Sequence, residues 1–175
     1  MGLGSVSGNT TPFGKNTMSI ELGLTAVDPS LADRVESDLA AGSGFSALLD
    51  APRCNLHKAW HAIHFLLTGS AEEAPLPEGY LLDGGHLLGK PDPDEMEAQP
   101  RLLSPEEVQI FAEVVRPINE QELRRRFDHA AMLDADVYSI GPHEDDEFEF
   151  VAQFLGELRT FVTEAAEITQ EENSG

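Results

Sequence analysis

The apolar residues of this 175-residue chain change their period along the sequence, and this change constrains the fold more than any other feature. Between Ser19 and Val27 they alternate with polar residues, which is typical of a strand with one buried face. After Asp28 they recur every three or four residues in separate segments, as on the buried side of a helix. The chain is therefore expected to combine a few strands with several helices.

Six segments carry the helical period, and several begin at recognisable boundary residues. Asp28 and Ser104 each precede a proline, so a capping side chain stands directly before the first helical residue. Glu107 completes a capping box with Ser104. The predicted helices cover residues 29–41, 45–50, 55–68, 105–116, 119–127 and 145–168.

The segment from Asn55 to Thr68 (NLHKAWHAIHFLLT) has the strongest helix signal. Asn55 is a suitable N-terminal cap, and Gly69 is a suitable C-terminal stop. The apolar stripe of this predicted helix consists of Leu56, Trp60, Ile63 and Leu67. We therefore expect one side of the helix to face the core.

Two segments in the middle of the chain read as turns or loops. Residues Tyr80–Gly89 (YLLDGGHLLG) predict a β-hairpin, because two short apolar runs flank Asp83-Gly84-Gly85. Residues Lys90–Pro100 contain three prolines and four acidic residues, so they are expected to form an exposed loop.

We expect one domain over residues 18–168, with a loose segment at each end. Residues 1–17 (MGLGSVSGNTTPFGKNT) are rich in Gly, Ser, Thr and Asn and show no apolar period. This composition predicts a flexible extension, which was either added in cloning or included through a misplaced start codon before Met18. Residues 169–175 are expected to form a disordered tail. A hydrophobic content of 41% suffices for one core.

Charge is the outlying property of the composition. Acidic residues outnumber basic ones by 32 to 11, which gives a formal net charge of -21. Self-repulsion of this size disfavours binding to nucleic-acid phosphates or anionic lipid, so we expect neither nucleic acid nor a membrane as a partner. The expected macromolecular partner is a basic protein. The alternative is that the acidic surface only suits a salty or crowded cytosol.

The single cysteine, Cys54, excludes an intramolecular disulfide and a multi-cysteine metal site. No apolar run approaches the roughly 18–20 residues that span a bilayer. The N-terminus also lacks the basic and then apolar pattern of a secretory signal. These features together predict a cytoplasmic protein.

Four motifs occur in the order found in a known family. They are Lys58–Gly69 (KAWHAIHFLLTG), Gly84-Gly85, Leu103–Val108 (LSPEEV) and Leu123–Asp128 (LRRRFD), and Ala131-Met132 follows the last of them. In this combination the chain resembles the YfbM-like family, also described as a domain of unknown function, DUF1877. The resemblance covers roughly residues 18–166.

The resemblance implies a helix-rich, mixed α/β single domain in which helices pack on both faces of a small mixed β-sheet. It implies no activity. Relatives tend to end with a short strand after the last helix, whereas this chain ends in ITQEENSG at residues 168–175. The final strand is therefore expected to be absent, which would leave a smaller sheet or an open edge.

Three histidines, His57, His61 and His64, lie four and three residues apart in the predicted 55–68 helix. At about 100° per residue, this spacing gathers the imidazoles within roughly 60°. Histidines four residues apart can share a metal ion, but the HExxH pattern is missing. The resembled family retains His61 and His64 without His57. We therefore expect structural histidines bonded to backbone or carboxylates, with a small-molecule or acid–base role as the alternative, and no metal or cofactor.

The main basic cluster is Arg124-Arg125-Arg126, with Asp128 and His129 beside it. Arginine can hold phosphate or carboxylate in bidentate geometry. Neighbouring residues of a helix point in different directions, so only one or two of the three side chains could converge, and intramolecular salt bridges are the alternative. The predicted ligand-binding residues are Trp60, His61, His64, Arg124 and Arg126.

No catalytic set is recognisable, and no catalytic residue is predicted. Residues 143–149 and 92–95 are acidic but lack the alternating ligands and central glycine of a calcium loop. Cys54 precedes His57 by three residues, yet a lone cysteine in such a setting is more often structural. Neither a Gly-x-Ser-x-Gly elbow nor a Walker loop is present.

Two classes of function remain. The first is a non-enzymatic acidic protein that engages or neutralises a basic partner, in the manner of an inhibitor or immunity protein. The alternative is a small-molecule-binding protein or enzyme with a His/Arg pocket near the Trp60 helix. We favour the first, because the second requires residues from separate segments to converge.

Overall fold

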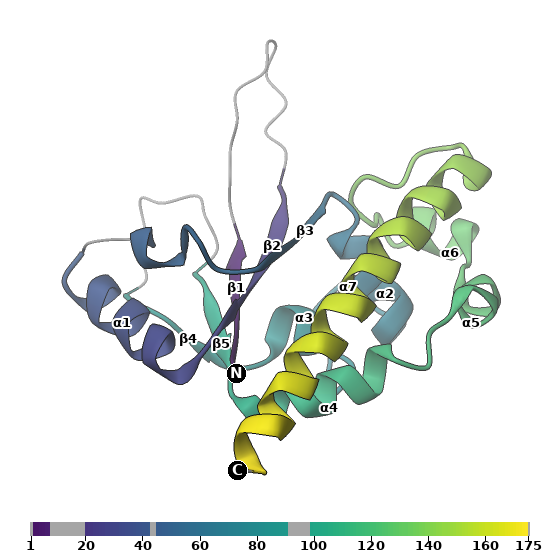
Figure 1. The fold of residues 1–175 in the computed structure, drawn as a ribbon. Helices are drawn as coiled ribbons and strands as arrows, with labels where there is room; N and C mark the ends of the chain where they lie inside the picture. The colour runs from purple at the N-terminus through teal and green to yellow at the C-terminus, as the bar shows by residue number, and fades with distance from the viewer. Residues whose placement is uncertain (1, 8–19, 43–44, 91–98, 175) are drawn as a thin grey trace.

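The structure is a computed structural model that describes residues 2–7, 20–42, 45–90 and 99–174, without the side chains of residues 2–7 and 170–173. Five strands form one sheet in the order β3-β2-β1-β5-β4 (Figure 1). The strands are β1 (Gly2–Ser7), β2 (Leu22–Val27), β3 (Arg53–His57), β4 (His86–Leu87) and β5 (Arg101–Leu103). Every neighbouring pair is antiparallel, so the expected mixed sheet is corrected to an antiparallel one.

The helices confirm a helix-rich α/β domain. They are α1 (Pro29–Ala40), the 3-10 helix η1 (Ser46–Leu48), α2 (Trp60–Thr68), α3 (Tyr80–Asp83), α4 (Pro105–Val115), α5 (Glu120–Arg126), α6 (His129–Asp134) and α7 (Glu144–Asn173). Among the described residues, no helix has both the length and the apolar character required to cross a bilayer.

The two faces of the sheet are covered by different helices, as expected. The alternating residues Leu22, Leu24 and Ala26 of β2 pack into the larger core, to which α2, α4 and α7 contribute. Val27 turns to the opposite face and joins a smaller core formed with α1 and η1. Figure 1 shows α1 on one side of the sheet and the α4–α7 layer on the other.

Local capping interactions place several helix starts where the sequence predicts them. Asp28 Oδ1 accepts a hydrogen bond from Leu31 N–H at 2.8 Å at the start of α1. Ser104 and Glu107 form the predicted capping box of α4. Asn119 Oδ1 accepts from Glu122 N–H at 3.0 Å and caps α5. Each cap satisfies a backbone donor that the helix itself leaves unpaired.

The last helix is longer than predicted. α7 runs from Glu144 to Asn173, so a disordered tail from residue 169 is wrong as far as Asn173. Thr169 is only 3% exposed, and its Oγ1 donates to Ala165 O at 3.0 Å. The burial of Ala165 and Ala166 continues the apolar side of the helix and explains why it does not fray at residue 168.

The N-terminal extension is also corrected. Residues Gly2–Ser7 form β1, the central strand, which pairs with β2 on one side and β5 on the other. A strand without an apolar period can be held by backbone hydrogen bonds on both sides, which composition does not reveal. The rest of the predicted extension, residues 8–17, lies outside the described residues.

The start of the predicted 55–68 helix is a strand instead. Arg53–His57 form β3, with Cys54 and Leu56 buried between exposed neighbours. His57 has a φ of 45°, and its N–H donates to Asn55 Oδ1 at 2.8 Å. This turn ends the strand, and α2 begins only at Trp60. Leu56 fits both the period of two that is typical of a strand and the period of 3.6 that is typical of a helix. The apolar pattern therefore did not distinguish the two structures here.

The predicted Tyr80–Gly89 hairpin is wrong as well. Tyr80–Asp83 form one helical turn, and the short strand β4 that follows pairs with β5 rather than with residues 80–82. Gly85 has a φ of +70°, and a Cβ there would approach Leu102 O to 2.3 Å. Glycine is therefore required at position 85 because the backbone packs closely against β5, and not because it forms a two-residue hairpin turn. Residues 91–98 of the expected loop lie outside the described residues.

Candidate functional site

The predicted ligand-binding residues begin with Trp60, the first residue of α2. Its ring stacks on that of His61, with 4.8 Å between the centroids, and lies 6.1 Å from the ring of Tyr138. Trp60 Nε1–H donates to Ile20 O at 3.1 Å, and Ile20 N–H donates to the Tyr138 hydroxyl at 3.1 Å. Trp60 thus ties α2 to the residues that lead into β2 and to the α6–α7 connection.

Both ring nitrogens of His61 are engaged within the chain. Nδ1 accepts a hydrogen bond from the Tyr138 backbone N–H at 2.8 Å. The proton must therefore sit on Nε2, which donates to Ala71 O at 2.7 Å. In this neutral tautomer His61 has no nitrogen free for a ligand or a proton transfer.

His64 is completely buried one turn later on α2. Its Nε2 lies 2.7 Å from Glu72 O and donates to it, and its Nδ1 has no hydrogen-bond partner among the described residues. His61 and His64 therefore hold two consecutive carbonyl groups, those of Ala71 and Glu72, and fold the chain back against α2 after Gly69. This geometry fits the structural interpretation of both histidines.

His57 does not join the other two histidines. It lies at the end of β3, with Nδ1 3.5 Å from Glu21 Oε2 and its ring 5.4 Å from that of Phe154. The three-histidine arc predicted from helical spacing is therefore not formed. Within the described part of the chain, no group of three or more His, Cys, Asp or Glu side chains is placed to hold a metal ion.

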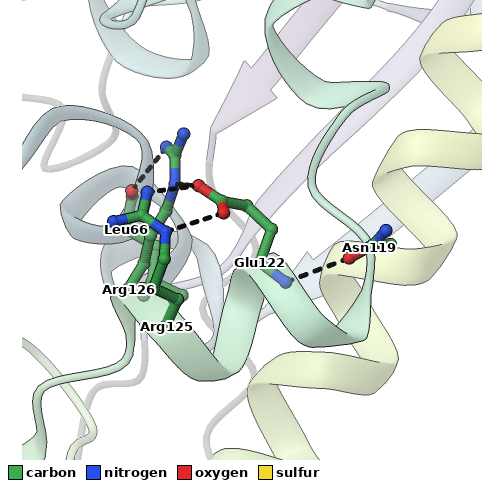
Figure 2. Close-up of polar contacts among 5 residues, drawn as sticks. All are labelled: Leu66, Asn119, Glu122, Arg125 and Arg126. Carbon is green, nitrogen blue, oxygen red and sulfur yellow. Dashed lines mark hydrogen bonds and ion pairs between the residues drawn. The ribbon is translucent and has the colours of Figure 1, made fainter.

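The arginines of α5 pair with acids of the same helix. Figure 2 shows the Glu122 carboxylate in contact with both Arg125 and Arg126. Arg126 Nη1 also donates to Leu66 O on α2 at 3.3 Å. Hydrogen bonds from Arg125 and then Arg126 lower the pKa of Glu122 to about 2. Arg124 binds Glu120 at 2.9 Å and lies 4.2 Å from the centre of the Phe148 ring. Arg126 thus approaches α2, whereas Arg124 turns toward α7.

Cys54 is not an activated nucleophile. It is 6% exposed on the core side of β3. Burial, followed by the charge of Glu157, raises its pKa to about 11. The thiol therefore stays protonated near neutral pH, where only the thiolate would react.

Two open grooves flank β3, and the sequence interpretation missed them because it placed Asn55–His57 in a helix and predicted no strand here. The first, of about 580 Å³, is lined by β2, β3 and η1. The second, of about 660 Å³, is lined by β3 and α7. Three residues of β3 line both: Arg53, Cys54 and Asn55. The sequence signal for this strand was the alternation of the polar residues Arg53, Asn55 and His57 with the apolar residues Cys54 and Leu56. The structure exposes the first three and buries the other two.

A row of exposed polar side chains follows α7 beside the second groove. The row consists of Glu149, Gln153, Glu157, Thr160 and Glu164. These residues are spaced by three or four positions, so they share one side of the helix. The last four of them line the groove.

Comparison with known proteins identifies a family without an assigned activity. A family model described as "Domain of unknown function (DUF1877)" matches residues 23–171. No curated protein and no solved structure matches the chain. The matched range begins in β2 and ends in α7, so it contains the second groove, the first groove apart from Glu21, and the His61 and His64 contacts.

Proposed function

The chain belongs to the DUF1877 family, a domain of unknown function, and from its own surface we propose that it is a non-enzymatic cytoplasmic protein that binds a basic partner protein. The proposal rests on how the charged side chains are distributed: many arginines are bonded within the chain, whereas many carboxylates remain exposed. A net charge of -21 is spread over a chain in which several guanidinium groups are already bonded to acids or backbone carbonyls of the same chain.

The arginine contacts occupy guanidinium groups within the chain. On α5, the three guanidinium groups pair with Glu120 and Glu122. Elsewhere, guanidinium groups donate to backbone carbonyls at Leu48, Leu49, Asp83, Gly84 and Ile118. The exposed side of α7 carries the carboxylates of Glu149, Glu157 and Glu164.

The acidic side of α7 supports an electrostatic mode of binding. Its first turn carries Glu144, Asp145 and Asp146, all exposed, and the row farther along adds Glu149, Glu157 and Glu164. Aligned carboxylates attract a basic surface over a Debye length of about 8–10 Å and accelerate association. Such binding is sensitive to salt, because mobile ions screen the attraction.

The alternative, a His/Arg ligand pocket near Trp60, has less support. His61 has both nitrogens engaged, and His64 is buried with its Nε2 bonded to Glu72 O. The Arg124 side chain contacts Glu120 and Phe148 instead of α2. A ligand at this position would first have to break the contacts that hold the fold together.

A capture experiment with matched charge variants tests the proposal. The immobilised protein is compared with the α7 variant E149Q/E157Q/E164Q and with the control D33N/E73Q/E78Q, which removes the same three charges from exposed positions elsewhere. We expect the wild type and the control to retain a basic cytoplasmic protein at low salt and release it at high salt. The α7 variant should retain less. Capture of no basic protein, or equal loss in both variants, would contradict the proposal.

A further inference from the structure

We propose that the free edge of β3 is a docking site for an extended peptide of the basic partner, which adds to the sheet as one more antiparallel or parallel strand. The proposal rests on the proposed function, because it specifies how the basic partner is held. The segment that carries it, Arg53–Asn55, lines both grooves.

The edge of β3 offers backbone hydrogen bonds to a new strand. Among the residues that the structure describes, β3 is the last strand of the sheet and is paired on one side, with β2. Ala26 N–H donates to Pro52 O at 2.9 Å. This bond determines which residues of β3 direct their backbone N–H and C=O groups toward β2 and which direct them away from it. Cys54 therefore directs its backbone groups toward β2, whereas Arg53 and Asn55 direct theirs toward the free edge.

The groove on the α7 side is suited to basic side chains. Glu157 and Glu164 line it, and the Arg159 guanidinium donates away to Ile118 O at 2.9 Å. Gly156 of α7 also lines this groove, and a Cβ there would meet no atom within 4 Å. The absence of a side chain at this position leaves the groove open beside the edge of β3.

The groove on the other face is suited to apolar side chains. Phe45, Leu48 and Leu49 line it, and Leu49 is 70% exposed. The Arg53 guanidinium donates to the carbonyls of Leu48 and Leu49 at 3.0 and 2.7 Å, which holds η1 in place beside β3. This apolar surface is thus formed before any partner binds.

The two grooves together specify the kind of peptide. Successive side chains of a strand point to opposite faces of the sheet. An added strand would direct every second residue toward Glu157 and Glu164, and the remaining ones toward Phe45 and Leu49. The partner segment is therefore an extended peptide in which lysine or arginine alternates with valine, leucine or isoleucine. Backbone bonds supply affinity in this mode, and the alternate side chains supply specificity.

A second copy of the chain is a less suitable occupant of the edge. Two molecules that each carry a net charge of -21 repel one another, and pairing of two β3 edges would bring their acidic α7 rows together. A basic peptide removes that repulsion.

The test uses fluorescently labelled octapeptides and the full chain, with anisotropy measured at low salt. One peptide alternates lysine and valine, and a second contains the same residues as a lysine block followed by a valine block. We expect the alternating peptide to bind about tenfold more tightly, because only it satisfies the β3 edge and both grooves together.

A pair of substitutions at one position isolates the backbone contact. Asn55→Pro removes the N–H that faces the free edge and leaves the β2 ladder intact, since proline is tolerated at such edge positions. Asn55→Ala removes only the side chain and its bond to His57 N–H. We expect about tenfold weaker peptide binding for N55P than for N55A.

A backbone-modified ligand keeps the test decisive if N55P does not fold. Alternating peptides are N-methylated at odd or at even residues. Only one set of N–H groups faces β3, so one methylated peptide should lose binding and the other should keep it.

The outcomes separate this inference from the proposed function. Equal binding of both peptides, equal binding by N55P and N55A, or equal loss for both methylated peptides would overturn strand addition. If E157Q/E164Q still weakened binding in that case, charge alone would attract the partner and the proposed function would stand. A dimer that sedimentation detects and that N55P abolishes would assign the edge to a second copy and overturn the inference.

Discussion

His61 Nδ1 accepts a hydrogen bond from the backbone N–H of Tyr138 at 2.8 Å, although 77 residues separate the two in the sequence. The same imidazole donates to Ala71 O. One side chain therefore fastens α2 to the segment that follows it and to the connection between α6 and α7. This arrangement favours a structural role for a histidine that also resembles a site residue.

The first prediction concerns this contact. His61→Ala leaves the Tyr138 N–H and the Ala71 carbonyl without their partner, so we expect the free energy of unfolding to fall by about 2–3 kcal/mol. Urea denaturation measures the change. His143→Ala, at an exposed position, is the control and should stay within about 0.5 kcal/mol of the wild type. A His61 variant as stable as the control would refute the structural role.

The second prediction concerns the stability of the fold at acidic pH. The pKa of Glu122 is about 2 in the folded chain, against an ordinary value of 4.5. Because the folded value is the lower one, the arginine contacts stabilise the fold fully above pH 4.5, and this contribution is lost as the pH falls toward 2. The destabilisation caused by Glu122→Gln should therefore be largest above pH 4.5 and shrink toward pH 2.

Urea denaturation over a pH series measures this difference. Glu78→Gln, at an exposed position without an arginine contact, is the control and should show no such trend. A Glu122→Gln effect that does not change with pH would contradict the lowered pKa.

The third prediction concerns the reactivity of Cys54. Its pKa of about 11 lies above the ordinary 9.0, so the folded protein contains about a hundredfold less thiolate than the unfolded chain near pH 8. Alkylation by iodoacetamide, followed by mass spectrometry, should be slower in the folded protein by at least this factor and should accelerate as the pH approaches 11. Equal rates with and without urea would show that the thiol is neither buried nor suppressed.

The fourth prediction compares two glycines. Gly85→Ala forces a side chain to a φ of +70° and toward Leu102 O at 2.3 Å, so we expect a loss of at least about 2 kcal/mol in the free energy of unfolding. Gly156→Ala lies in the middle of α7 with no atom within 4 Å, so we expect a gain of about 0.5–1 kcal/mol. Thermal denaturation of both variants measures the contrast, and the same sign for both would contradict it.

Sequence alone was sufficient where an interaction closes within three or four residues. The caps at Asp28, Ser104 and Asn119 each join a side chain to a backbone N–H three residues later. The alternation in β2 correctly predicted that Leu22, Leu24 and Ala26 are buried. It failed for Thr25, which is buried on the opposite face, and for Ile20, which is 54% exposed before the strand begins.

Tertiary structure decided the elements whose local pattern was compatible with two outcomes. Leu56 suited both a helix stripe and an alternating strand, and pairing of Cys54 with Leu24 on β2 selected the strand. That selection moved His57 away from His61, created a free sheet edge and opened the grooves on both sides of it. Strand pairing between segments far apart in sequence uses backbone groups that almost every residue carries, so the residue pattern does not specify which strand is the partner.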